Sequence, residues 1–280
     1  MSIPPAARRP AGVEPLFIDT ASGRLAALRG GPLDGTALLL VPGFTGSKED
    51  FLPVFPDLAA AGFCVTAIDQ RGQFESGWNA DYSLDAFAAD VAEVGAQLAG
   101  GGPLHVVGHS FGGLVCRQAV LSGPAPIVSL TLLNSGPGPL PQEHQVLLHA
   151  MREMIPVADL EQIWRAKKLL DQANNVPEPD PETEAFLHRR WVANDPANLF
   201  AVAGHLMTAP DRTDELAQSG VRLRVMAGAN DETAWPVPEL LAMARRLGGE
   251  AVVIPDAAHS PAVENPAATV AELVAFVSDI

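Results

Sequence analysis

A serine between two glycines, where a strand pattern gives way to a helix pattern, is the feature that most constrains the fold of this chain. Residues 107–113 read Val-Gly-His-Ser-Phe-Gly-Gly, after a short apolar run and before helical spacing over residues 114–121. At so sharp a turn, the residues two places before and after the serine come into close contact, and glycine has no Cβ to clash there. The pattern predicts a nucleophile elbow with Ser110 at its tip. The alternative is an ordinary glycine turn between a strand and a helix. Motifs elsewhere in the chain are needed to distinguish the two.

Two polar side chains follow later strand patterns. Asp231 comes shortly after the apolar run 225–228, and His259 lies in the loop after the apolar run 251–254. The order Ser, Asp, His along the chain is that of the α/β-hydrolases, and it differs from the order in the other well-known serine triads.

Two further segments carry the same resemblance. The apolar run 38–41 continues into Pro42-Gly43-Phe44-Thr45-Gly46, which resembles the α/β-hydrolase loop that donates a backbone N–H to the oxyanion hole. Asp69-Gln70-Arg71-Gly72 is similar to the Asp-x-Arg-Gly turn common after the fourth strand of that family. From about residue 16 to 280, the chain resembles esterase-like members with a serine nucleophile and a helical cap. It departs from the pattern at Pro42, where histidine is common, and at Gln73 and Phe74, where glycine is more usual.

The element pattern agrees with this resemblance. Short strand patterns alternate with helix patterns as far as residue 133 and again from residue 211, which indicates a mainly parallel twisted sheet with helices on both faces. Residues 137–210 show helix patterns only, at the point where the family carries its lid. We therefore expect a core domain of residues 1–136 and 211–280 with an inserted helical cap, 137–210. After a proline-rich, mobile leader to about residue 15, the expected strands are 16–19, 25–29, 37–41, 64–68, 103–107, 127–133, 223–227 and 251–254; the expected helices are 53–62, 84–99, 111–122, 142–155, 160–173, 182–193, 196–207, 211–218, 238–247 and one starting at Asn265.

The resemblance implies a role for each candidate site residue. A serine hydroxyl is a weak nucleophile at neutral pH and needs a base that is oriented by an acid. Ser110 would be the nucleophile, His259 the base and Asp231 the acid. The backbone N–H groups of Phe44 and Phe111 would form the oxyanion hole.

Some assignments have competitors. Asp256 and Glu232 are nearby carboxylates that could replace Asp231, and Asn134 ends a strand where some relatives place the acid, although an amide cannot carry its charge. For substrate contacts we expect His205 and Trp164 in the cap, and Trp235. Most aromatic residues of the cap are expected to form its own core.

Serine at the elbow argues against haloalkane dehalogenases and epoxide hydrolases, which carry aspartate there. The sequence predicts an enzyme, a serine hydrolase that cleaves a small, largely apolar carboxylic ester. Thioester hydrolysis, C–C bond hydrolysis and perhydrolysis by the same triad remain open, as does a ligand-sensing protein on the same scaffold, because a fold alone does not fix a function.

Composition and charge exclude some classes of binding partner. The formal net charge of −15 argues against nucleic acid and anionic membrane surfaces as partners. No apolar run approaches the roughly 20 residues needed to cross a bilayer, and the N-terminus has no signal-peptide core, so we expect a cytoplasmic protein. The two cysteines, Cys64 and Cys116, have no metal-ligand spacing and are expected to be buried. No cofactor and no metal are expected, the partner is a small-molecule substrate, and the oligomeric state stays open.

Overall fold

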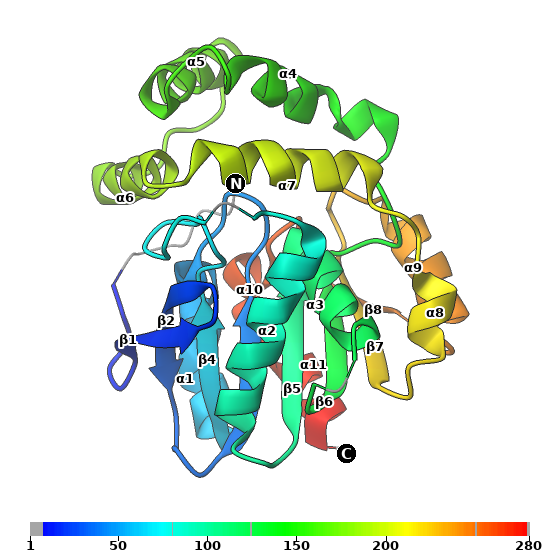
Figure 1. Ribbon diagram of the computed structural model, residues 1–280. Coiled ribbons are helices and arrows are strands. Elements are labelled where there is room, and N and C mark those ends of the chain that lie inside the picture. The colour runs from blue at the N-terminus through cyan, green and yellow to red at the C-terminus, as the bar shows by residue number, and fades with distance from the viewer. Residues whose placement is uncertain (1–7, 80, 124, 250, 279–280) are drawn as a thin grey trace.

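The computed structural model describes residues 8–79, 81–123, 125–249 and 251–278. These residues contain one sheet with the strand order β1-β2-β4-β3-β5-β6-β7-β8 (Figure 1). Strand β2 pairs antiparallel with β1 and β4, and the pairs from β4 to β8 are parallel. The expected mainly parallel sheet is therefore present. The strands are β1 (Glu14–Thr20), β2 (Gly23–Gly30), β3 (Thr36–Val41), β4 (Phe63–Ile68), β5 (Leu104–His109), β6 (Ile127–Leu133), β7 (Arg222–Gly228) and β8 (Ala251–Ile254).

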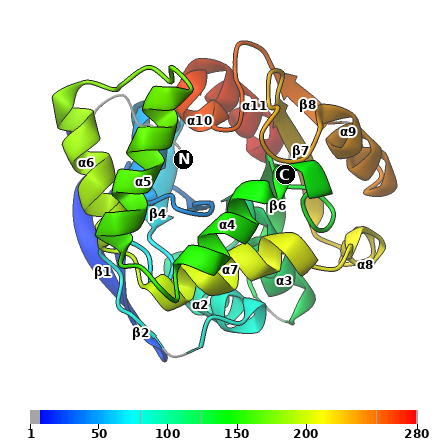
Figure 2. The same cartoon turned by 90° about the horizontal axis from the view of Figure 1, so that it is seen from above.

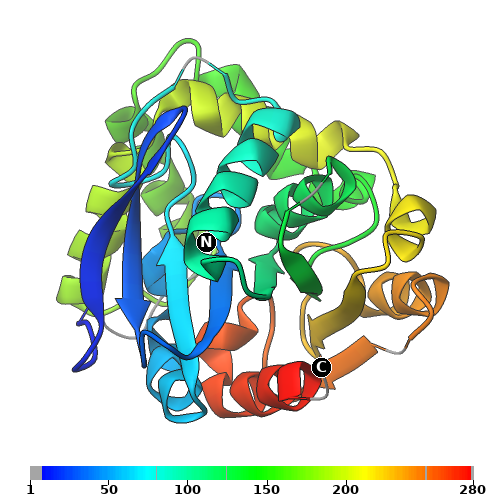
Figure 3. The ribbon, with the colours of Figure 1, turned by 60° about the horizontal axis from the view of Figure 1, so that its bottom comes forward.

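Both faces of the sheet are buried under helices (Figure 3). Along β3, Leu39 and Val41 belong to one apolar cluster, whereas Leu38 and Leu40 belong to another on the opposite face. This explains why the central strands read as continuous apolar runs, since alternate side chains point to opposite faces. One face is covered by α2 (Leu84–Ala99), α3 (Phe111–Leu121), α8 (Thr213–Ala217) and α9 (Val237–Arg246); the other is covered by η1 (Lys48–Val54), α1 (Phe55–Ala60), α10 (Pro261–Glu264) and α11 (Pro266–Ser278).

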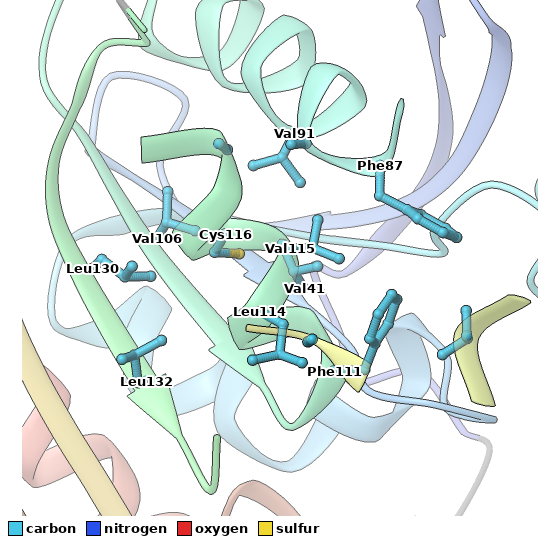
Figure 4. Close-up of a cluster of buried hydrophobic side chains, with 14 of the residues drawn as sticks. Val41, Phe87, Val91, Val106, Phe111, Leu114, Val115, Cys116, Leu130 and Leu132 are labelled. Atoms are coloured by element: carbon cyan, nitrogen blue, oxygen red, sulfur yellow. The ribbon is translucent and has the colours of Figure 1, made fainter. Parts of the chain in front are cut away.

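The elbow helix α3 is held in the larger cluster (Figure 4). Phe111, at its first turn, packs edge-on against Phe87 of α2, with ring centroids 5.4 Å apart. Leu114 and Val115 follow on the buried side of the same helix. Burial of side chains of this size contributes about 1.5 to 3 kcal/mol each, so the helix after Ser110 is firmly fixed.

A layer of helices between β6 and α8 lies over the carboxyl ends of the strands (Figures 1 and 2). We call this layer of helices the cap. The cap has its own apolar cluster, which includes Trp164, Phe186 and Trp191, as expected for its aromatic residues. Its elements are η2 (Gln142–His144), α4 (Val146–Met154), α5 (Leu160–Ala173), α6 (Pro181–Val192) and α7 (Pro196–Thr208).

The expected elements occur with small shifts at their ends, and two short helices were not expected. The segment Lys48–Val54 forms the 3₁₀ helix η1, so the helix predicted over 53–62 begins later, at Phe55. The four-residue helix α10 is too short to show a periodic pattern. Residues 1–7 of the predicted leader lie outside the described residues. Strand β1 already begins at Glu14, so the leader ends slightly earlier than expected.

The burial of the cysteines and the character of the helices can be compared with what the sequence predicts. Cys116 is buried, whereas Cys64 is only partly buried, so the expectation of two buried cysteines holds for one of them. Among the helices described, none has the length and apolar character required to cross a bilayer.

Candidate active site

The strand-to-helix turn after β5 has the geometry that the glycines of the motif predict. Ser110 has φ of 52° and ψ of −120°. A positive φ strains the backbone of any residue that has a Cβ. A Cβ on Gly108 would lie 2.5 Å from the Cα of Gly113, and one on Gly112 would collide with the carbonyl oxygen of Val41. The close approach therefore requires both glycines, and it holds Ser110 at the tip of the turn.

His259 and Asp231 form a direct pair beside this turn. The His259 Nδ1 atom lies 2.7 Å from the Asp231 Oδ2 atom. Asp231 also accepts hydrogen bonds from the Asn134 Nδ2 at 2.8 Å and from the backbone N–H and hydroxyl of Thr233 at 3.0 and 2.9 Å. Burial favours the neutral acid, but the hydrogen bonds from His259, Thr233 and Asn134 outweigh it and lower the pKa of Asp231. The ionised carboxylate holds the Nδ1–H tautomer of His259, which leaves Nε2 able to accept a proton.

His109, inside the elbow, supports the histidine loop. Its Nε2 lies 2.6 Å from the carbonyl oxygen of His259. Burial, together with the nearby His259, lowers the pKa of His109 to about 3. His109 is therefore neutral at physiological pH, and because its Nε2 faces a carbonyl oxygen, that nitrogen carries the proton and donates it.

The loop after β3 lies against Ser110. A Cβ on Gly43 would come 2.9 Å from the Cβ of Ser110, so Gly43 is needed for this approach. Phe44 follows Gly43 directly, and Phe111 follows Ser110 as the first residue of α3, where backbone N–H groups have no partner within the helix. Both residues expected to supply oxyanion donors therefore lie close to Ser110.

Buried charges connect this loop to the cap. Arg190 of α6 is fully buried, and its Nη1 donates to the Asp50 Oδ1 at 2.6 Å. Lys48, two residues before Asp50 at the start of η1, donates from Nζ to the Asp69 Oδ2 at 2.7 Å. Removal of one partner from such a pair leaves an uncompensated buried charge, which is strongly destabilising.

Ser110, His259 and Phe44 line one cavity of about 350 Å³ beneath the cap. The volume suits a small to medium-sized ligand. Polar lining groups include His144 and Lys167. The cap supplies most of the remaining wall with apolar side chains: Leu140, Leu147, Leu148, Ala150, Met151, Met154, Ile163, Ala166, Leu170, Trp191 and Leu206.

The three residues expected to contact substrate lie elsewhere, and the lining of the cavity, as far as the chain is described, does not include them. His205 stacks on the Phe111 ring, and its Nε2 lies 2.8 Å from the carbonyl oxygen of Tyr82. Trp164 is buried in the cap cluster. Trp235 is fully buried and donates from Nε1 to the carbonyl of Gly138. Each makes packing or hydrogen-bond contacts within the protein instead.

The alternative acids are placed differently from Asp231. Asp256 and Glu232 are exposed. Asn134 does not replace the acid but holds it, because its Nδ2 donates to Asp231 and its Oδ1 accepts from the Gly228 N–H at 3.0 Å. The sequence offered one signal for this role, a polar residue at the end of β6.

Trp191 and His144 line the cavity but were not expected to. Trp191 also donates from Nε1 to the carbonyl of Leu160, so it serves the cap core and the cavity at once. In the parts of the chain that the structure describes, no three His, Cys, Asp or Glu side chains are grouped so that they could hold a metal ion.

Comparisons with known proteins place the chain among its relatives. A Variovorax paradoxus protein named for carbamate hydrolysis, RutD, is 39% identical over 107 residues, which are 38% of this chain and 40% of that protein. The dihydrolipoyllysine-residue acetyltransferase component of the acetoin cleaving system of Cupriavidus necator is 29% identical over 245 residues, 81% of this chain and 60% of that protein. The chain thus spans less than two thirds of the length of both relatives.

The fold also recurs in solved structures. A carboxylesterase structure from Nitrososphaera gargenis superposes with a TM-score of 0.77 at 17% identity, covering 94% of this chain and 98% of that one. The family model described as the alpha/beta hydrolase family matches residues 38–273, a segment that contains Phe44, Ser110, Asp231 and His259. Because that match covers most of the sequence, the chain belongs to the alpha/beta hydrolase family.

Proposed function

We propose that this protein is a serine hydrolase, a carboxylesterase that acts on small, largely apolar esters through Ser110, His259 and Asp231. The observation that carries the proposal is that Ser110 and His259 open onto one cavity whose walls are mainly apolar, with the Asp231 carboxylate 2.7 Å from the His259 Nδ1. An acyl chain would be held by the cap while its carbonyl carbon is presented to Ser110.

The chemistry follows from these positions. His259 Nε2 takes the proton of Ser110 as the hydroxyl attacks the ester carbonyl, and it returns that proton to the leaving alcohol. Asp231 stabilises the imidazolium that forms in between. The backbone N–H groups of Phe44 and Phe111 stabilise the tetrahedral oxyanion, at roughly 3 to 4 kcal/mol for each donor. Water then hydrolyses the acyl-enzyme by the same steps.

The cavity favours uncharged acyl groups of short to medium length. Eleven of its lining residues are apolar side chains of residues 140–206. Lys167, its lining cation, is paired with Asp171 of the same helix, which reduces its attraction for a charged substrate. The net charge of −15 acts against polyanions at long range.

The test is a panel of 4-nitrophenyl esters of graded acyl length, together with matched thioesters and amides. A fluorophosphonate should label the protein at Ser110, and Ser110→Ala should abolish both labelling and turnover while the protein stays folded. Ester turnover that persists in Ser110→Ala would contradict the covalent mechanism. Tight binding of a ligand without any turnover would favour a sensing protein instead.

A further inference from the structure

The peptide group between Gly43 and Phe44 has to face one way if its N–H is to serve as an oxyanion donor. Gly43 must be glycine, because a Cβ there would lie 2.9 Å from the Cβ of Ser110 and 3.2 Å from the carbonyl oxygen of His109. Glycine is also the residue with the fewest restrictions on φ and ψ. The same steric demand that brings the loop against Ser110 thus leaves this peptide without a restraint from its own residue.

The Gln73 side chain supplies a restraint from the neighbouring turn. Its Nε2 donates to the carbonyl oxygen of Gly43 at 2.9 Å, and its Oε1 accepts from the backbone N–H of Gln70 at 3.0 Å. The second bond decides which end of the amide is the donor, since only the oxygen can accept from an N–H. Gln73 is 2% exposed, so water does not replace these partners.

The sheet order explains how Gln73 reaches the loop. Gln73 lies in the turn after β4, and β4 pairs in parallel with β3, which carries the loop of Gly43. Parallel neighbours end at the same edge of a sheet, so the two turns are adjacent. Gln70 in the same turn donates from Nε2 to the carbonyl of Pro42 at 2.9 Å, and the Gly46 N–H also donates to the Gly43 carbonyl, at 3.2 Å.

We propose that Gln73 is a positioning residue for the oxyanion hole, because its hydrogen bond to the Gly43 carbonyl fixes the direction of the Phe44 N–H. A trans peptide is planar, and its C=O and N–H point in opposite directions. Holding the oxygen on the side of Gln73 therefore holds the N–H on the other side. This inference rests on the proposed serine-hydrolase function, and it gives a role to Gln73, a position where the chain departs from the pattern of its family.

Loss of the Gln73 hydrogen bond is expected to weaken binding of the transition state and to leave binding of the substrate nearly unchanged. Without the hydrogen bond from Gln73, the Gly43 carbonyl keeps only the longer bond from the Gly46 N–H, and the peptide rotates more readily. A rotated peptide points its carbonyl oxygen, instead of the N–H, toward the oxyanion. An interaction made with the oxyanion and not with the substrate lowers kcat when it is lost and leaves KM nearly unchanged. Loss of a whole donor costs about 10²- to 10³-fold in kcat, so loosening one should cost about 10-fold or more.

The experiment compares Gln73→Met, which removes both hydrogen bonds at similar volume, with Gln73→His, whose ring N–H restores a donor at similar reach. Four quantities are measured on each variant: kcat and KM for a 4-nitrophenyl ester, the affinity of an alkyl trifluoromethyl ketone, which forms a tetrahedral adduct with serine, and the affinity of the matched unactivated methyl ketone. Asn79→Leu is the matched control, since the Asn79 Nδ2 donates to the Ser22 carbonyl at 2.8 Å, at the far edge of the sheet.

For Gln73→Met we expect kcat and the affinity of the trifluoromethyl ketone to fall by the same factor, about 10-fold or more, while KM and the methyl ketone affinity stay within about 2-fold. Gln73→His should recover most of the loss, and Asn79→Leu should show none. An unchanged kcat in Gln73→Met, or an equal loss of affinity for both ketones, would overturn the assignment. If Gln73→Met does not fold, Gln73→Asn gives the same comparison, because it keeps an uncharged amide in the turn but is one methylene shorter and does not reach the Gly43 carbonyl. A wild-type protein with no turnover and no labelling at Ser110 would refute the proposed function itself.

Discussion

Arg117 joins the elbow helix to both ends of the cap insertion, and its replacement is expected to destabilise the protein substantially. The side chain is 2% exposed on α3. Its Nη1 donates to the carbonyl of Pro137, and its Nη2 donates to the carbonyl of Pro210 at 3.1 Å. Burial lowers the pKa of Arg117 to about 10, so the guanidinium is still charged at neutral pH. One residue of the core thus holds the chain where it leaves the sheet layer and where it returns.

The magnitude follows from these two bonds. A hydrogen bond to a charged group contributes about 1.5 to 3 kcal/mol, and Arg117→Met removes two of them. The desolvation cost of burying a guanidinium is relieved at the same time, which offsets part of the loss. We expect the free energy of unfolding to fall by about 3 kcal/mol. In chains of roughly 150 to 250 residues, Tm shifts by about 2 to 4 °C for each kcal/mol of unfolding free energy, so Tm should drop by about 6 to 12 °C.

The assay is thermal unfolding followed by circular dichroism, with limited proteolysis as a local probe. Arg117→Lys, which keeps a charge and can reach one carbonyl at most, should fall between the wild type and Arg117→Met. Arg245→Met removes an exposed arginine from α9 and is the matched control. Cleavage should begin near residues 137 and 210 in Arg117→Met. A Tm within about 2 °C of the wild type would refute the reasoning.

Three further outcomes are expected. Asp231→Asn should lower kcat by about 10⁴-fold, because tautomer control of His259 is lost; if Asp256→Asn has the larger effect, the acid is misassigned. His109 has a pKa of about 3 in the folded protein and an ordinary value of 6.5 when unfolded, so the unfolded state binds more protons between these values. The free energy of unfolding should therefore decrease as pH falls through 6.5 toward 3, by about 2 kcal/mol down to pH 4.5, and His109→Gln should flatten that slope in urea titrations at several pH values. Ala166→Trp, which adds bulk to the cavity wall, should shift the ester preference toward shorter acyl chains, whereas Ala173→Trp near the end of the same helix should not; equal profiles would place the acyl group elsewhere.

Much of the fold could be predicted because its signals are local. Helix α2 spans residues 84–99 and α5 spans 160–173, as expected, and both begin after a capping residue, Ser83 or Asp159, whose side chain accepts a backbone N–H of the first turn. Pro266 likewise opens the last helix, and Asn265 accepts from the Ala268 N–H. Such signals depend on residues three or four places apart, which a single sequence displays.

Contacts between distant segments could not be predicted in the same way. The hydrogen bond from His109 to the carbonyl of His259 joins residues 150 places apart, and that from Asn134 to Asp231 joins residues 97 places apart. Phe74 is a similar case. It has φ of 37°, where glycine is favoured, yet its ring packs edge-on against Phe186 of the cap with centroids 5.8 Å apart. The strain is local and visible in the motif, but the contact that offsets it exists only in the folded chain.

Other long-range contacts link the cap to the site that it covers. Arg190 of the cap is paired with Asp50, which lines the cavity, and Tyr82 of the core donates to the Asp195 carboxylate at 2.5 Å, where α7 begins. Removal of the whole cap would leave the Asp50 charge buried without its partner, next to the loop that carries Phe44. Loss of labelling at Ser110 after such a deletion would then reflect a collapsed oxyanion loop as much as a lost pocket. Single substitutions on the cavity wall separate the two effects, because they change the space offered to the acyl group and leave the pair between Arg190 and Asp50 in place.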